Sequence, residues 1–214
     1  AETGRLYIMN IDHCNSHSSF TDKVEMSNLC QEITLPTKPL NHIDDPNGEI
    51  ALCILSAVNV GKIRDLEDLE VLCDLAVRSL DELIDFQNYP IRAAEIATKA
   101  RRSLGIGYIG LAHYLAKNGQ GYSDPGAWKL VHELSEAFQY YLIQSTVNLA
   151  EEKGACEYSS RTKYGNGILP IDTYKNDVDE IVPNELHYDW ESLRLRVKEH
   201  GVRNSTLSAQ MPSE

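Results

Sequence analysis

IALCILSAVNV, residues 50–60, is a run in which only Ser56 and Asn59 interrupt the apolar side chains. It is too short to cross a bilayer, which takes about 20 residues. Near-continuous apolar character over this length is typical of a strand in a sheet that is covered on both faces. We therefore expect a buried strand over residues 50–60, in which Cys53 on its own is most simply interpreted as a core side chain.

Helical periodicity begins after this run. Asp65 can cap a helix to about Phe86, because apolar residues recur there at three- and four-residue steps: Leu69, Leu72, Ala76, Leu80 and Leu83. Further helices are expected over residues 91–103, 127–153 and 190–200. Their ends are marked by Pro90, Pro125, Gly154, Asp189 and Gly201. Strands separated by helices predict an α/β fold with parallel strands.

Shorter strands are expected on either side of this central region. Residues 4–10 (GRLYIMN), 29–35 and 203–209 (RNSTLSA) have the apolar alternation of strands. Residues 12–20 are polar and rich in turn formers. The sequence contains no internal repeat and no low-complexity segment.

Composition limits the class of protein. The 214 residues suffice for a large core, and the formal net charge is −12. Such a charge disfavours sequence-independent nucleic-acid binding, although a local basic pocket for a small phosphate ligand is compatible with it. The chain shows neither a signal peptide nor a membrane-length apolar run. Five scattered cysteines, at positions 14, 30, 53, 73 and 156, indicate free thiols in a reducing compartment, by default the cytoplasm.

Residues 105–110, GIGYIG, match the glycine pattern of a dinucleotide-binding turn. That turn requires a strand before it and an acidic residue at the end of the next strand. Residues 93–102 have helical character instead, so we interpret the glycines as positions of close backbone packing.

Two other patterns are weaker. HCNSH, residues 13–17, has a Cys-x-x-His spacing, but a structural zinc site normally needs a second such pair, which the sequence lacks. A Cys-His hydrolase remains a distant alternative, because none of the seven histidines lies in a recognisable signature. Cys73 follows Leu72 in the first long helix and is interpreted as core, and Cys156 as incidental.

SNLCQEI, residues 27–33, places polar side chains at every second position. In a strand, Asn28, Cys30 and Glu32 would share one face, about 6–7 Å apart. An unpaired carboxylate is costly to bury, so this face is expected to meet water, a ligand or a polar partner. An edge strand with a free cysteine explains the same pattern.

Taken together, these motifs resemble the large catalytic subunit of class I (aerobic) ribonucleotide reductase. The B12-dependent class tends to carry Pro-Cys-Gly where this chain has Leu29-Cys30-Gln31, which favours class I. The similarity covers essentially the whole chain in order: GRLYI (4–8), DHCN (12–15), SNLCQEI (27–33), LPTKPL (35–40), GEIALC (48–53), RRSLGIG (101–107), GILPIDTYK (167–175), LHYDWE (186–191), RNSTLSA (203–209) and MPSE (211–214).

The resemblance implies a fold and a chemistry. Residues 1–214 would be a single segment of a ten-stranded α/β barrel with helices outside and a central finger loop that carries the catalytic cysteine. Cys30 would become a thiyl radical that takes the 3′-hydrogen of a ribonucleoside diphosphate. Glu32 would act as general base on the 3′-hydroxyl, and Asn28 would position the ribose. Cys53 would be one of two thiols that end as a disulfide and are regenerated by exchange.

Further residues are implied with less detail. Ser27 belongs to the expected substrate-binding set with Asn28. Pro212, Ser213 and Glu214 match the start of the loop that holds the substrate phosphates. Arg5 matches a position near the radical-transfer route. No metal ligand is implied within the segment.

The resemblance also implies partners. A metal-containing small subunit would supply the radical, and thioredoxin or glutaredoxin would supply the electrons. Allosteric nucleotides would bind outside this segment, and the complete subunit would form a homodimer. The chain lacks the family's second redox cysteine, relay tyrosines and tail cysteines, so we expect a piece of a longer polypeptide that is inactive alone. A split-gene product or a non-catalytic assembly module is the alternative interpretation.

Overall fold

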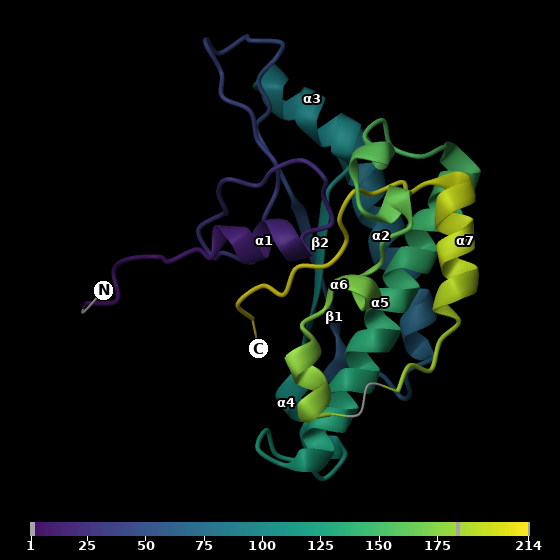
Figure 1. Cartoon of the computed structure of the whole chain (residues 1–214). Coiled ribbons are helices and arrows are strands. Elements are labelled where there is room, and N and C mark those ends of the chain that lie inside the picture. The colour runs from purple at the N-terminus through teal and green to yellow at the C-terminus, as the bar shows by residue number, and fades with distance from the viewer. Residues whose placement is uncertain (1–2, 183–184, 214) are drawn as a thin grey trace.

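The computed structural model describes residues 3–182 and 185–213, which form a mixed α/β structure (Figure 1). In chain order the helices and strands are α1 (Ile11–His17), β1 (Ile54–Asn59), the 3-10 turn η1 (Val60–Lys62), α2 (Asp68–Phe86), α3 (Arg92–Arg101), β2 (Leu104–Ile109), α4 (Leu111–Lys117), α5 (Pro125–Lys153), the 3-10 turns η2 (Ser159–Arg161) and η3 (Tyr164–Asn166), α6 (Pro170–Thr173), the 3-10 turn η4 (Asn176–Glu180) and α7 (Trp190–His200).

The sheet confirms the expected parallel arrangement. β1 pairs with β2 in parallel, from Ile54 opposite Leu104 to Asn59 opposite Ile109. β1 begins later than predicted, because the residues before it bond elsewhere. Ile50 donates its backbone N–H to the Ala93 carbonyl, and Glu49 forms an antiparallel bridge with Lys38. Residues 203–209 run along the other edge of β2 and pair with it at one parallel bridge, between Ile106 and Ser208. They do not form the strand that was predicted.

The GIGYIG stretch is β2 together with Gly110, so it is not the dinucleotide-binding turn. Its glycines serve close packing, as predicted. A Cβ atom on Gly105 would lie 2.6 Å from the Cδ2 atom of Leu55 and 2.8 Å from the Sγ atom of Cys53, and one on Gly107 would lie 2.7 Å from the Ala209 carbonyl oxygen. Residues of normal size would separate the strand from its neighbours on both sides.

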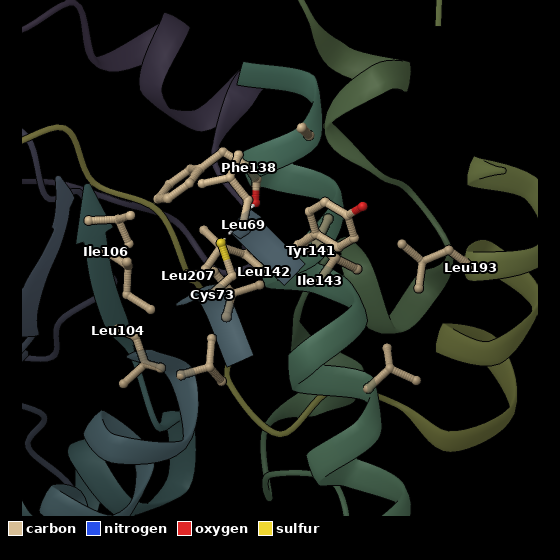
Figure 2. Close-up of a cluster of buried hydrophobic side chains, with 14 of the residues drawn as sticks. Leu69, Cys73, Leu104, Ile106, Phe138, Tyr141, Leu142, Ile143, Leu193 and Leu207 are labelled. Carbon is tan, nitrogen blue, oxygen red and sulfur yellow. Dashed lines mark hydrogen bonds between the residues drawn. The ribbon is translucent and has the colours of Figure 1, made fainter. Parts of the chain in front are cut away.

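The main core lies between the strands and the long helices. Figure 1 shows α1 and the N-terminal coil on one side of the two strands, and α2, α5 and α7 on the other. Side chains of β2, α2 and α5 meet there (Figure 2). The buried stripe of α2 consists of Leu69, Cys73, Val77, Leu80 and Ile84.

This stripe differs in part from the predicted one. Cys73 is buried as expected, but Leu72 and Leu83 are 36% and 46% exposed. α2 carries a second apolar row, and helical spacing alone does not determine which row faces the core.

The predicted long helices are confirmed with small changes at their ends. α5 starts at Pro125 and ends before Gly154. α7 is capped as expected, since the Asp189 carboxylate accepts a hydrogen bond from the Ser192 backbone N–H at 3.0 Å. None of the helices in residues 3–182 and 185–213 combines the length and apolarity needed to cross a membrane.

The region before β1 differs most from prediction. Residues 4–10 and 29–35 form no strand, and residues 11–17 form the helix α1. A small second core holds this region to the sheet. It consists of the buried Phe20, Val24 and Leu35, with Met9, Ile33, Ala51 and Cys53 packed against it.

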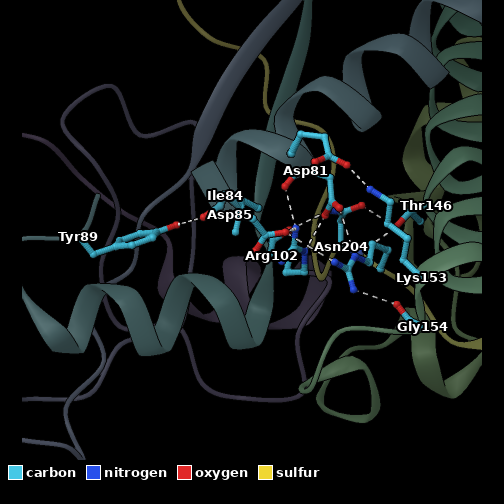
Figure 3. A network of polar contacts seen from close by, with 11 residues as sticks. Asp81, Ile84, Asp85, Tyr89, Arg102, Thr146, Lys153, Gly154 and Asn204 are labelled. Atoms are coloured by element: carbon cyan, nitrogen blue, oxygen red, sulfur yellow. Dashed lines mark hydrogen bonds and ion pairs between the residues drawn. The ribbon is translucent and has the colours of Figure 1, made fainter. Parts of the chain in front are cut away.

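A buried polar network ties the helical layer to the segment after α7 (Figure 3). Arg102, in the left-handed conformation at φ 48°, donates from Nε to Asp81 at 2.6 Å and from Nη1 to Asp85 at 2.9 Å. Asn204 donates to Asp81 at 3.0 Å and accepts from the Thr146 hydroxyl at 2.9 Å. The network therefore fixes α2, the α3–β2 junction, α5 and residue 204 relative to one another.

Candidate active site

Residues 27–33 form a turn, so the prediction of a strand here was wrong. The Gln31 N–H donates to the Asn28 carbonyl at 3.2 Å, and Gln31 has a positive φ of 61°. A left-handed residue ends an extended conformation, and therefore alternation along a strand does not explain which side chains meet.

Asn28 and Glu32 nevertheless meet, through the turn. The Asn28 amide donates from Nδ2 to Glu32 Oε1 at 2.7 Å, and its Oδ1 accepts the Ile33 backbone N–H at 3.1 Å. The Ser27 hydroxyl donates to the Ile33 carbonyl at 2.7 Å. Asn28 thus fixes the carboxylate of Glu32 and the return of the chain together.

Cys30 lies in the same turn, between these two residues, and is exposed. The side chain is not part of the lining of the cavity described below. The thiol is therefore available to a molecule that approaches the turn from outside.

Glu32 and Cys53 line one cavity of about 180 Å³. The remaining lining comes from the end of α1, the residues that follow Glu32, β2, η3 and the chain beside β2. These lining residues are His17, Ser18, Ser19, Ile33, Thr34, Leu35, Leu104, Tyr164, Thr206, Ser208 and Ala209. The carboxylate and the thiol come from positions 21 residues apart, and the packing of residues 27–35 onto the start of β1 brings them to one space.

The Cys53 thiol is protonated at neutral pH. Burial, and secondly the negative charge of Glu32, raise its pKa to about 12. The S–H group lies 3.9 Å from the Ile54 carbonyl oxygen, toward which it can donate. Cys53 in this state is a hydrogen donor and a weak nucleophile.

Three of the residues that line this cavity have a side-chain oxygen atom without a hydrogen-bond partner among the described residues. These buried oxygen atoms are Oγ of Ser18, Oγ of Ser19 and Oε2 of Glu32. Buried polar groups are nearly always hydrogen-bonded, so a cluster of exceptions calls for a specific explanation. A polar ligand in the cavity would satisfy all three.

Arg101 holds the segments on both sides of the turn. It is 2% exposed, and its guanidinium donates to Glu49 from Nε at 3.0 Å and Nη2 at 2.7 Å, and to Asp22 from Nη1 at 3.0 Å. The guanidinium also lies over the Tyr158 ring, 5.0 Å from its centroid. Although burial opposes it, hydrogen bonds from Arg161 and Arg101 hold the pKa of Asp22 below its usual value.

The other predicted site residues lie elsewhere or outside the described part. Arg5 is exposed in the N-terminal coil, and Pro212 and Ser213 are exposed at the other end of the chain; none of them lines the cavity. Glu214 lies outside the described residues. In the HCNSH stretch, His13 and His17 make an edge-to-face ring contact at 6.5 Å. Within residues 3–182 and 185–213, no three His, Cys, Asp or Glu side chains are grouped to hold a metal ion.

Sequence reasoning missed the hydroxyl groups of the cavity. Ser18 and Ser19 fall in a stretch that its composition marked only as a turn, and Thr206 and Ser208 fall in the predicted strand 203–209. The available signal was the local density of Ser and Thr, which has no specificity by itself.

The chain belongs to the family described as the ribonucleotide reductase barrel domain, whose family model matches residues 1–214. It is 62% identical to the ribonucleoside-diphosphate reductase subunit alpha of Haemophilus influenzae over 100% of its own length. It is 58% identical to the ribonucleoside-diphosphate reductase 1 subunit alpha of Escherichia coli, again over its whole length. The subunit alpha of Enterobacteria phage T4 is 43% identical over 99% of the chain. The chain spans 28–29% of the length of these relatives.

Proposed function

We propose that this segment supplies the catalytic turn and one redox thiol of a ribonucleoside-diphosphate reductase, which makes deoxyribonucleotides for DNA synthesis. The observation that carries the proposal is the cavity at which Glu32, fixed by Asn28 and with one free carboxylate oxygen, meets the protonated thiol of Cys53. The names of the relatives support the same reaction.

Each residue of the site has a role in this chemistry. Cys30, as a thiyl radical, takes the 3′-hydrogen atom of the ribose and becomes a thiol. Glu32 accepts the proton of the 3′-hydroxyl through its free oxygen, while Asn28 holds the carboxylate in place. The 2′-hydroxyl takes a proton from one of the two redox thiols and departs as water, and Glu32 later returns its proton to the 3′-oxygen.

Two electrons then reduce the sugar. Cys53 and a second thiol outside this segment supply them, and the two sulfur atoms join as a disulfide. The hydrogen atom returns from Cys30 to the 3′-carbon, which restores the thiyl radical. A protonated Cys53 is the form that this step requires, and the raised pKa of the thiol supports it.

For the architecture, we propose that residues 1–214 form one segment of a ten-stranded α/β barrel, with residues 27–33 as the tip of its finger loop. The parallel register of β1 and β2 and the name of the family model support this. The remaining strands would come from other parts of the subunit.

The partners follow from the reaction. A metal-containing small subunit would supply the radical, thioredoxin or glutaredoxin would reduce the disulfide, and the complete subunit would act as a cytoplasmic homodimer with allosteric nucleotides bound elsewhere. Ser27 would contact the substrate, residues 212–214 would begin its phosphate loop, and Arg5 would lie near the radical route.

The test is Cys30→Ser in the complete catalytic subunit that contains this segment, assayed with its radical-generating partner. Formation of deoxyribonucleoside diphosphate should cease while assembly stays intact. Cys14→Ser is the matched control, since Cys14 is also a free thiol but lies in α1, outside the turn at residues 27–33, and it should retain turnover. Unchanged turnover of Cys30→Ser would refute the proposal and favour an assembly module without activity.

A further inference from the structure

Ser18 and Ser19 contribute to the lining of the cavity that Glu32 and Cys53 also line. Their hydroxyl oxygens are fully shielded from solvent yet have no partner among the described residues. Both residues also line a neighbouring cavity of about 370 Å³, which His13 and Lys163 border. The two serines therefore form a partition with free hydroxyl groups.

The backbone around these serines is firmly held. The Ser18 N–H donates to the Cys14 carbonyl at 2.8 Å and so ends α1, while the Ser19 carbonyl accepts the Lys163 N–H at 2.7 Å. The Lys163 ammonium group also donates to the carbonyls of Asn15 at 3.3 Å and Ser16. The main chain is thus anchored at both residues, whereas the two side-chain hydroxyls have no partner in the described part of the chain.

An apolar residue would fill these positions without the cost of burying a hydroxyl group. An unsatisfied buried hydroxyl is destabilising, whereas its removal from a fold that does not use it is nearly neutral or favourable. Two adjacent unsatisfied hydroxyls that share a cavity with a third unsatisfied oxygen, Oε2 of Glu32, are therefore explained best by a ligand.

The chemistry of the three atoms identifies the ligand group. Glu32 Oε2 accepts hydrogen bonds, and each serine hydroxyl both donates and accepts. A group with two adjacent hydroxyls can donate to the carboxylate from one of them and exchange hydrogen bonds with the serines through the other. A volume of about 180 Å³ corresponds to about six water molecules at ~30 Å³ each, which also suits one sugar ring.

We propose that Ser18 and Ser19 are binding residues for the ribose hydroxyls of the nucleoside diphosphate, together with Glu32. This inference rests on the proposed function, since it takes the ligand to be the substrate of that reaction. It adds the end of α1 to the site, so that the ribose is held between the turn at residues 27–33 and the partition of the two serines.

The experiment measures binding to the complete catalytic subunit by equilibrium dialysis, without the radical-generating partner. The ligands are CDP and its 2′-deoxy and 3′-deoxy analogues, and the variants are Ser18→Ala and Ser19→Ala. Thr98→Val is the control, because the Thr98 hydroxyl is also buried and unpaired but lies on α3, outside the cavity lining.

We expect each serine variant to raise the Kd of CDP about 3- to 10-fold, the loss of one hydrogen bond. The effect should disappear for the analogue that lacks the contacted hydroxyl, and Thr98→Val should bind CDP as the unaltered protein does. An unchanged Kd for CDP in both serine variants would overturn the inference and leave the hydroxyls to ordered water. Equal weakening for CDP and both analogues would also overturn it, since the contact would then not be to the ribose hydroxyls.

The result separates this inference from the proposed function. If the unaltered subunit binds and reduces CDP and the serine variants bind it equally well, only the role of the serines fails. If the unaltered subunit neither binds nor reduces ribonucleoside diphosphates, the proposed function itself fails.

Discussion

Replacing Arg101 by Met should uncouple the turn at residues 27–33 from the rest of the fold. Arg101 is the shared partner of Asp22, before the turn, and Glu49, after it. The change retains most of the side-chain volume and removes the charge. Glu49 is 3% exposed, so its carboxylate would keep only Lys38, at 2.5 Å, as an ionic partner.

The cost can be worked out from these contacts. Removing one partner of a buried ion pair typically costs 3–5 kcal/mol. Lys38 and Arg161 retain part of the compensation for the two carboxylates, whereas the stacking of the guanidinium on Tyr158 is lost as well. We therefore expect a loss of about 3 kcal/mol in the free energy of unfolding of the region, measured by denaturant titration of the complete subunit.

The effect on turnover should exceed the effect on stability. A displacement of about 1 Å at reacting groups can reduce the rate about 100-fold, and Arg101 fixes both ends of the segment that carries Cys30 and Glu32. Turnover per folded molecule should therefore fall about 100-fold, measured where the variant remains folded.

Arg102→Met is the matched control. Arg102 is the next residue and is also buried and ion-paired, but its partners Asp81 and Asp85 lie on α2. We expect a similar loss of stability with a much smaller loss of turnover. Equal turnover per folded molecule in the two variants would refute the view that Arg101 positions the turn.

Two further predictions concern Cys53. Because the pKa of Cys53 is about 12, about one thiol in ten thousand is ionised at pH 8. Alkylation by iodoacetamide, followed by peptide mass spectrometry, should therefore be slow and should accelerate as the pH rises toward 12. Glu32→Gln should lower the pKa of the thiol and speed the reaction, and an equal rate in both proteins would contradict this assignment. Gly105→Ala should destabilise the subunit by about 1–3 kcal/mol in denaturant titration, because the added Cβ would lie 2.6 Å from Leu55 and 2.8 Å from the Cys53 sulfur, and unchanged stability would show that this space is not filled.

The long helices and the strand within residues 50–60 could be predicted because their signals are local, whereas β2 was not predicted as a strand. The periodicity of residues 68–86 and the cap at Asp189 act within one or two turns of helix. The choice between two apolar rows on α2 could not be predicted in the same way, since it depends on what packs against the helix.

The region of the site was harder to predict because its sequence is ambiguous. The alternation in SNLCQEI fits a strand, yet a left-handed Gln31 turns the chain and brings Asn28 to Glu32 by another route. Spacing gave the wrong local structure here, and the roles proposed for these residues rest on the family resemblance. The cavity itself joins Ser18, Cys53 and Ser208, which lie far apart in the sequence and meet only through tertiary packing.

The tight fit at Gly105 constrains how the sequence of this segment can diverge. Because glycine has no Cβ atom, the Cys53 sulfur and the Leu55 side chain can occupy the space beside residue 105. A lineage could accept a larger residue at position 105 only with smaller side chains at both 53 and 55, and a smaller residue at 53 would remove the thiol. Positions 53 and 105 should therefore vary together or not at all, and a descendant with a smaller residue in place of Cys53 would face a weaker constraint on the glycine.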